Sequence, residues 1–146
     1  MSAIVGSAAG AALLVIGAFH IWWVRSPWPC ATRQDLARNV VGRPEGDLPP
    51  VFVSLSILVG ALLGVAAHLV AAKAGVVPAG LPDGLVTAGA WAVAAVLLLR
   101  GAAGFAQSAL ELGHAPLRYR YLDLRVYSPL CVVLGALVVV VIVSAS

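Results

Sequence analysis

Four long apolar stretches constrain the fold of this chain more than any other feature of its sequence. Each approaches the length of about 20 residues that an α-helix needs to cross the hydrocarbon core of a bilayer. Runs such as ALLVIGAF and LVVVVIV are continuously apolar, whereas the strands of a transmembrane barrel alternate apolar and polar residues. With 62% hydrophobic and only 10% charged residues, the composition also lies outside the usual range of soluble domains. The sequence therefore predicts an all-α protein, an integral membrane four-helix transmembrane bundle.

These stretches leave little chain for anything else, so residues 1–146 are expected to form a single membrane domain. The predicted transmembrane helices span residues 3–24, 51–72, 85–112 and 126–144. A short interfacial helix is predicted over residues 34–41, because Thr32 and Asp35 have the spacing of a capping box and Gly42 supplies a stop. This helix is expected to lie along the inner membrane surface. A plain connecting helix with solvated arginines is the alternative.

Basic residues predict the orientation of the helices, because short cytoplasmic loops carry an excess of Lys and Arg. The two longer loops hold almost all of them, namely Arg25, Arg33, Arg38, Arg43, Arg118, Arg120 and Arg125. We therefore expect a multi-pass protein of the cell inner (plasma) membrane with both termini extracytoplasmic. The first helix lacks the basic n-region of a signal peptide and is expected to be retained. The net charge of +3 is explained by these basic loops, so it does not indicate a nucleic acid partner, and none is expected.

Small residues share one face on each of the first two predicted helices, which predicts a close contact between these helices. The residues are Gly6, Gly10 and Gly17 on the first helix and Gly60, Gly64, Ala67 and Ala71 on the second. His20 and His68 flank these faces, and a hydrogen bond across the helix interface is their simplest role. They belong to opposite leaflets, so they are not expected to share a haem or metal. No metal site and no cofactor are expected, and His114 is expected to be exposed in a loop.

The third predicted helix carries Arg100, Gln107 and Glu111 on one stripe. Arg100 lies a few residues below the inner interface, where an unpaired charge is costly and an inward orientation with a partner is the default expectation. Snorkelling to lipid headgroups is the alternative. Asp123 is brought to about the same depth, so we expect it to pair with Arg100 or with Arg125.

The start of the last helix allows two interpretations. Ser128 and Pro129 have the sequence of an N-cap and a first helical residue. A helix that begins at Pro129 would be shorter than the hydrocarbon core, because each residue adds only about 1.5 Å. The preceding YLDLRVY segment must therefore either dip into the inner leaflet or continue the helix outward through a proline kink.

Cys30 and Cys131 both fall on the predicted cytoplasmic side, where thiols are kept reduced. A structural disulfide is therefore not expected. Cys131 is interpreted as a small packing residue, whereas Cys30, in SPWPC, allows either a packing or a reactive role.

Three motifs resemble those of a known family. They are His-x-x-Trp in HIWW, Leu-Arg-Gly in LLLRGAAG around Arg100, and Asp-x-x-x-Tyr-Ser-Pro-Leu-Cys in YLDLRVYSPLC. The chain resembles a family of small four-pass bacterial membrane proteins that is catalogued only as a domain of unknown function. The resemblance implies the four-helix fold and the membrane location. It also implies that a common pattern includes His20, Arg100, Asp123, Tyr127 and Pro129. It implies no activity.

The leading functional hypothesis is a polar, cytoplasm-facing intramembrane cavity. The residues expected to form it are His20, Arg100, Gln107, Asp123 and Tyr127. Such a cavity would bind a small or amphipathic ligand, and an anionic one because Arg is suited to carboxylate or phosphate. The secondary candidates for this polar cluster are Trp23, Arg125, Cys131 and His68.

Two alternatives stay open at this point. One is a membrane oxidoreductase or transferase that acts on a lipid or quinone, with His20 or Tyr127 in proton transfer and Cys131 or Cys30 in redox chemistry. The other is an accessory or scaffold subunit of a larger membrane complex, in which Arg100 and Asp123 only fix helix packing. The expected partners are membrane lipids, and a homo-oligomer or a larger complex is left open.

Overall fold

The computed structural model describes residues 2–145 and contains four helices long and apolar enough to cross a membrane. They are α1 (Ser2–Trp23), α3 (Phe52–Lys73), α4 (Asp83–Ala109) and a continuous helical stretch over Leu117–Ser144. The last comprises α5 (Leu117–Leu122), a π-helical turn η2 (Asp123–Tyr127) and α6 (Ser128–Ser144). No strand occurs among the described residues. The all-α transmembrane bundle predicted from the sequence is confirmed.

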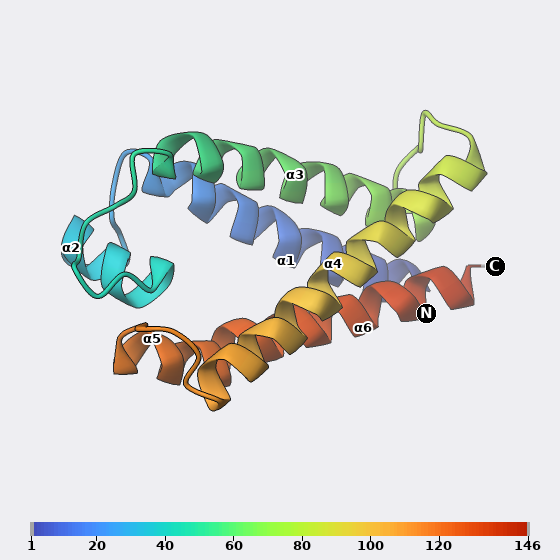
Figure 1. The fold of residues 1–146 in the computed structure, drawn as a ribbon. Coiled ribbons are helices and arrows are strands. Elements are labelled where there is room, and N and C mark those ends of the chain that lie inside the picture. The colour runs from blue at the N-terminus through green and yellow to red at the C-terminus, as the bar shows by residue number, and fades with distance from the viewer. Residues whose placement is uncertain (1, 146) are drawn as a thin grey trace.

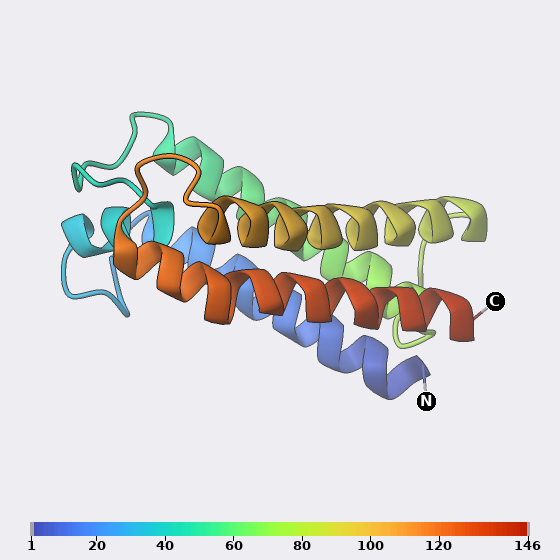
Figure 2. The same cartoon turned by 60° about the horizontal axis from the view of Figure 1, so that its bottom comes forward.

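The bundle consists of two antiparallel helix pairs, α1 with α3 and α4 with α6, which separate toward one end (Figure 1). The two chain termini lie together at the opposite end, as a second view also shows (Figure 2). Every arginine other than Arg100 lies in the short helices and connections at the end where the helix pairs separate. We call this end the basic end. At the other end Lys73 pairs with Asp83 at 3.5 Å, so the net charge of +3 resides at the basic end. Which end faces the cytoplasm stays a prediction.

The contact between α1 and α3 is made by small residues, as predicted. Backbone atoms and Cβ atoms of α3 and of the residue after it lie opposite the glycines of α1. A Cβ on Gly17 would lie only 3.1 Å from the carbonyl oxygen of Gly60. A Cβ on Gly10 would lie 3.4 Å from the carbonyl oxygen of Ala67. Such close backbone approach stabilises helix association in lipid, because burying apolar surface gives no hydrophobic driving force there. Gly64 is the exception, because nothing lies within 4 Å of its Cβ position.

All four long helices contribute to an apolar core that lies in the half of the bundle nearer the chain termini. Its fully or almost fully buried residues include Leu13 of α1, Val70 of α3, Ala90 of α4 and Val138 of α6. The outer faces of the same helices expose large apolar side chains, as surfaces solvated by lipid do. The polar groups described below therefore lie beside this core, toward the basic end.

The last helix corrects the prediction that Ser128 is an N-cap. Ser128 has helical dihedral angles (φ −69°, ψ −46°), and its N–H donates to the carbonyl of Asp123 five residues earlier. The helix thus begins at Leu117 and not near residue 126. A π turn directly precedes Pro129, which lacks an N–H and would crowd the carbonyl one α-turn before it. The segment 117–127 therefore continues the helix outward and does not dip into the membrane as a separate element.

Two other boundaries follow from local chemistry. Thr32 caps α2 (Arg33–Leu36) by accepting the N–H of Asp35 at 3.0 Å, and the π-helical η1 (Ala37–Val41) then ends at Gly42 with φ 79°. The short predicted helix is thus present. Helix α4 stops at Ala109, three residues before its predicted end at 112, so Glu111 (φ 56°) leaves the predicted polar stripe. The Glu111 carboxylate instead pairs with Arg120 of α5 at 2.6 Å.

Candidate functional site

The partner of the intramembrane arginine is Asp123. Arg100 Nη2 of α4 lies 3.1 Å from Asp123 Oδ1 of η2. The Arg100 side chain is 42% exposed, whereas that of Asp123 is 1% exposed. The pairing predicted from the sequence is confirmed, with Arg100 and not Arg125 as the partner.

Two serine hydroxyls complete the environment of the Asp123 carboxylate. Ser108 of α4 donates to Oδ2 at 2.6 Å, and Ser128 of α6 donates to Oδ1 at 3.1 Å. Gly104 makes room for the cluster, because a Cβ there would collide with Ser128 Oγ and with the Arg100 guanidinium. Protein groups thus bind both carboxylate oxygens, and the cluster ties α4 to the start of α6. This arrangement fixes helix packing and gives the Arg100 charge a partner inside the chain.

Tyrosines connect this corner to the short helices at the basic end. The Tyr127 hydroxyl donates to the carbonyl of Asn39 in η1 at 3.1 Å. The Tyr119 ring lies 6.2 Å from that of Tyr127 and packs against Gly42, whose Cβ position is 3.3 Å from the ring. The Tyr127 and Tyr119 side chains therefore connect the last helical stretch to η1 and Gly42.

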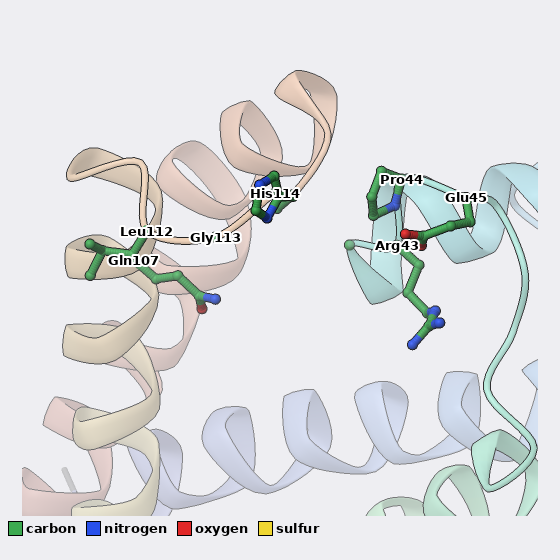
Figure 3. A pocket seen from close by; sticks show the side chains of 9 residues that line it. Arg43, Pro44, Glu45, Gln107, Leu112, Gly113 and His114 are labelled. Carbon is green, nitrogen blue, oxygen red and sulfur yellow. The ribbon is translucent and has the colours of Figure 1, made fainter.

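Gln107 lines a polar hollow of about 300 Å³ at the basic end. Its walls come from the end of α4 and the following loop on one side and from the loop after η1 on the other (Figure 3). In Figure 3 Gln107 extends from the α4 side, Arg43 points downward from the loop on the opposite side, and His114 lies between them near the top of the view. Glu45 adds a carboxylate to the wall. Among residues 2–145, the side chains of Arg43, Gln107 and His114 have no hydrogen-bond or ion-pair partner.

His20 and Trp23 line a different hollow of about 220 Å³, between α1, η1 and the start of α3. Apolar side chains form most of its wall, with Ser56 as a second polar residue. His20 Nδ1 lies 2.8 Å from the carbonyl of Ile16, one turn earlier in α1. A carbonyl only accepts, so Nδ1 carries the proton and Nε2 is an acceptor in the neutral ring.

The five residues predicted to form one cavity do not line a common hollow of these two. His20 and Gln107 line separate hollows, and the residues that line either hollow do not include Arg100, Asp123 or Tyr127. The reason is that Asp123 draws Arg100 into the α4–α6 contact, while the earlier end of α4 turns the loop after Gln107 toward η1. Two of the five residues thus border hollows at which a ligand could bind, and the other three belong to the packing contacts.

The secondary candidates lie apart from these hollows, except Trp23. Arg125 donates to the Tyr121 hydroxyl at 3.3 Å and stacks over that ring. His68 Nε2 lies 3.4 Å from the carbonyl of Ala79, at the end of the bundle opposite His20. Neither histidine makes the predicted hydrogen bond across a helix interface. Cys131 is a free, partly buried thiol beside the Arg100–Asp123 pair.

Cys30 is also a free thiol and lies in the connection between α1 and α2. Burial, and then the negative charge of Asp35, raise the pKa of this thiol above its ordinary value. The thiolate is the reactive form, so the environment of Cys30 opposes redox or nucleophilic chemistry at neutral pH. Within residues 2–145 no three His, Cys, Asp or Glu side chains converge as metal ligands do.

The sequence did not predict that Arg43, Glu45 and His114 line one hollow. The prediction that His114 is exposed in a loop is confirmed, but nothing in the sequence spacing of Arg43 and His114 indicates that they line the same hollow. Gly42 is the signal that was present, because its left-handed conformation (φ 79°) turns the chain after η1 toward the end of α4.

Comparison with known proteins adds the family. A model of the family described as "Protein of unknown function (DUF3995)" matches residues 13–138, which include all of the motifs noted above. No curated protein and no solved structure matches the chain. The match confirms the resemblance to an uncharacterised family and covers most of the chain. This membrane protein therefore belongs to the DUF3995 family of unknown function.

Proposed function

We propose that this membrane protein binds a small polar ligand with an anionic group in the hollow between Gly42–Glu45 and Gln107–Ala115. The observation that carries the proposal is that three side chains without partners, Arg43, Gln107 and His114, line this one hollow. The volume of about 300 Å³ is near the lower limit of small-molecule sites, which suits a compact ligand.

The charges on the wall narrow the chemistry of the ligand. Arg43 presents a planar fork of donors that suits a phosphate or carboxylate. Gln107 offers both a donor and an acceptor, and Glu45 offers an acceptor to a hydroxyl or ammonium group. A phosphate ester that also carries a hydroxyl or ammonium group satisfies all three. The net positive charge of the basic end attracts such an anion.

The Arg100–Asp123 cluster plays an indirect part in this proposal. It joins α4 to η2 and so sets where the end of α4, with Gln107, lies relative to η1. Arg100 itself is not a ligand-binding residue here, because its charge is paired with Asp123. This departs from the hypothesis that Arg100 binds the anion directly.

The test is isothermal titration calorimetry, in which glycerol phosphate is added to the purified protein in lipid nanodiscs. Arg43→Gln should weaken binding by about tenfold to a hundredfold, the effect of losing a hydrogen bond to a charged group. Arg25→Gln is the matched control, because Arg25 is also exposed at the basic end but does not line the hollow. Equal binding by wild type, Arg43→Gln and Arg25→Gln, or no binding by wild type, would contradict the proposal.

The closed Arg100–Asp123 cluster also suits the accessory-subunit alternative, in which the polar groups serve only packing. Under that alternative, the wild-type protein should co-purify with one stoichiometric larger partner, and glycerol phosphate should not bind.

A further inference from the structure

The apolar hollow lies between the end of α1, η1 and the start of α3. Its wall is made of Trp23, Val40, Val41, Pro49, Phe52, Leu55 and Val59, with His20 and Ser56 as the polar exceptions. Leu55 is 50% exposed and Val59 is 36% exposed. Both lie in a helix long and apolar enough to cross the membrane. The hollow therefore borders exposed apolar side chains of α3, which suit a hydrocarbon chain better than water.

The apolar and polar hollows flank the same short stretch of chain. Val40 and Val41, at the end of η1, line the apolar hollow, and Gly42, the next residue, lines the polar one. Figure 3 shows Arg43 extending from this stretch toward the faint blue ribbon of α1, which is the helix that carries His20. Residues 40–43 therefore contribute to the walls of both hollows.

We propose that the ligand is a single-chain amphiphile, with its anionic headgroup in the polar hollow and its hydrocarbon chain in the apolar hollow. This inference rests on the proposed function, because it adds a tail to the ligand of the same polar site. The class that fits is a lysophospholipid-like molecule, in which a phosphate and a hydroxyl or ammonium group are linked to one acyl chain.

The two polar residues of the apolar hollow support an ester link at this depth. Ser56 is 5% exposed, lines the hollow, and its hydroxyl has no partner among the described residues. The hydroxyl is therefore available to donate to an ester carbonyl. His20 Nδ1 donates to the carbonyl of Ile16, which leaves Nε2 to accept a hydrogen bond from a ligand hydroxyl next to the ester. An unbranched alkane would leave both groups without a hydrogen bond, which is unfavourable in an apolar surrounding.

The volume of the apolar hollow argues for one chain. At about 220 Å³ it is smaller than the polar hollow, and α1, α3 and η1 bound it on three sides. The Tyr127 hydroxyl holds η1 in place through the Asn39 carbonyl. A two-chain lipid would leave its second chain outside the hollow, in the bulk bilayer.

The experiment compares three probes on the purified wild-type protein by native mass spectrometry and calorimetry: lauroyl lysophosphatidic acid, glycerol phosphate as the head alone, and lauryl alcohol as the tail alone. Val59→Phe fills the apolar hollow. Val65→Phe is its matched control, because Val65 lies on the same helix and is 57% exposed but does not line the hollow.

The lysolipid should bind wild type at least about tenfold more tightly than glycerol phosphate does. Val59→Phe should remove this advantage and leave glycerol phosphate binding unchanged, while Val65→Phe should behave as wild type. If lysolipid and glycerol phosphate bind equally to all three proteins, the tail inference is overturned and the polar site stands. If lauryl alcohol binds as tightly as the lysolipid and Arg43→Gln changes nothing, the proposed function fails and the two-part site fails with it.

Discussion

Removing the two partners of the Arg100–Asp123 pair should have unequal effects on stability, because their side chains are unequally buried. Replacement of Arg100 by Gln leaves the Asp123 carboxylate, 1% exposed, without its cation. Loss of one partner of a buried pair costs about 3–5 kcal/mol when nothing else binds the remaining charge. Here the hydroxyls of Ser108 and Ser128 remain, at 2.6 and 3.1 Å. We therefore expect Arg100→Gln to lower the free energy of unfolding by about 2–3 kcal/mol.

Asp123→Asn should be less harmful. The Arg100 side chain is 42% exposed, so its head can move toward the interface and recover solvation there. The variant retains the shape of the side chain and loses the charge-assisted part of its hydrogen bonds, a cost of about 1–2 kcal/mol. The double variant should be close to Asp123→Asn alone, since the buried charge is then gone.

A double-mutant cycle measured by reversible unfolding in mixed detergent micelles tests this directly. The expected coupling between the two sites is about 2–3 kcal/mol, because the double variant should lose no more stability than Asp123→Asn alone. Additive single effects, or an Asp123→Asn variant that is less stable than Arg100→Gln, would refute the assignment of Asp123 as the buried member of the pair.

Three further predictions concern the surroundings of the site. Gly104→Ala should destabilise the bundle by about 1–3 kcal/mol in the same unfolding assay, because its methyl group collides with Ser128 and Arg100; Gly84→Ala, where the Cβ position is open, is the control. Tyr127→Phe should increase hydrogen exchange across η1, because it removes the hydrogen bond to Asn39; unchanged protection would argue against this contact. Iodoacetamide should alkylate Cys30 slowly at neutral pH and faster as pH rises, since the raised pKa of this thiol keeps the thiolate fraction low. Asp35→Asn should lower that pKa and speed the reaction, and an alkylation rate that ignores pH would contradict the prediction.

The parts of the structure that followed from the sequence are those governed by the surrounding solvent. Apolar runs of membrane length define the four long helices, whichever neighbours they have. A charged residue inside such a run requires a partner, which is why Arg100 and Asp123 were paired correctly. Close approach of Gly17 to Gly60 likewise follows from small residues on one face.

The parts that did not follow depend on contacts between distant segments. The π turn before Pro129 occurs where Pro129 lacks an N–H and where the Ser128 hydroxyl donates to Asp123. The sequence alone did not predict this turn, because a serine before a proline also matches an N-cap. Ser108 follows Gly104 by one helical turn, so its face was predictable, but its bond to Asp123 was not. Arg43 and His114 line the same hollow because α4 ends early and Gly42 turns the chain, and hydrophobic periodicity predicts neither feature.

Native mass spectrometry of gently purified protein is the most direct test of ligand binding at the basic end. Wild type, Arg43→Gln and Arg25→Gln would be compared for small molecules that remain bound after purification. We predict a phosphate-containing adduct on wild type and on Arg25→Gln that is lost from Arg43→Gln. The same adducts in equal amounts on all three proteins would contradict a site centred on Arg43.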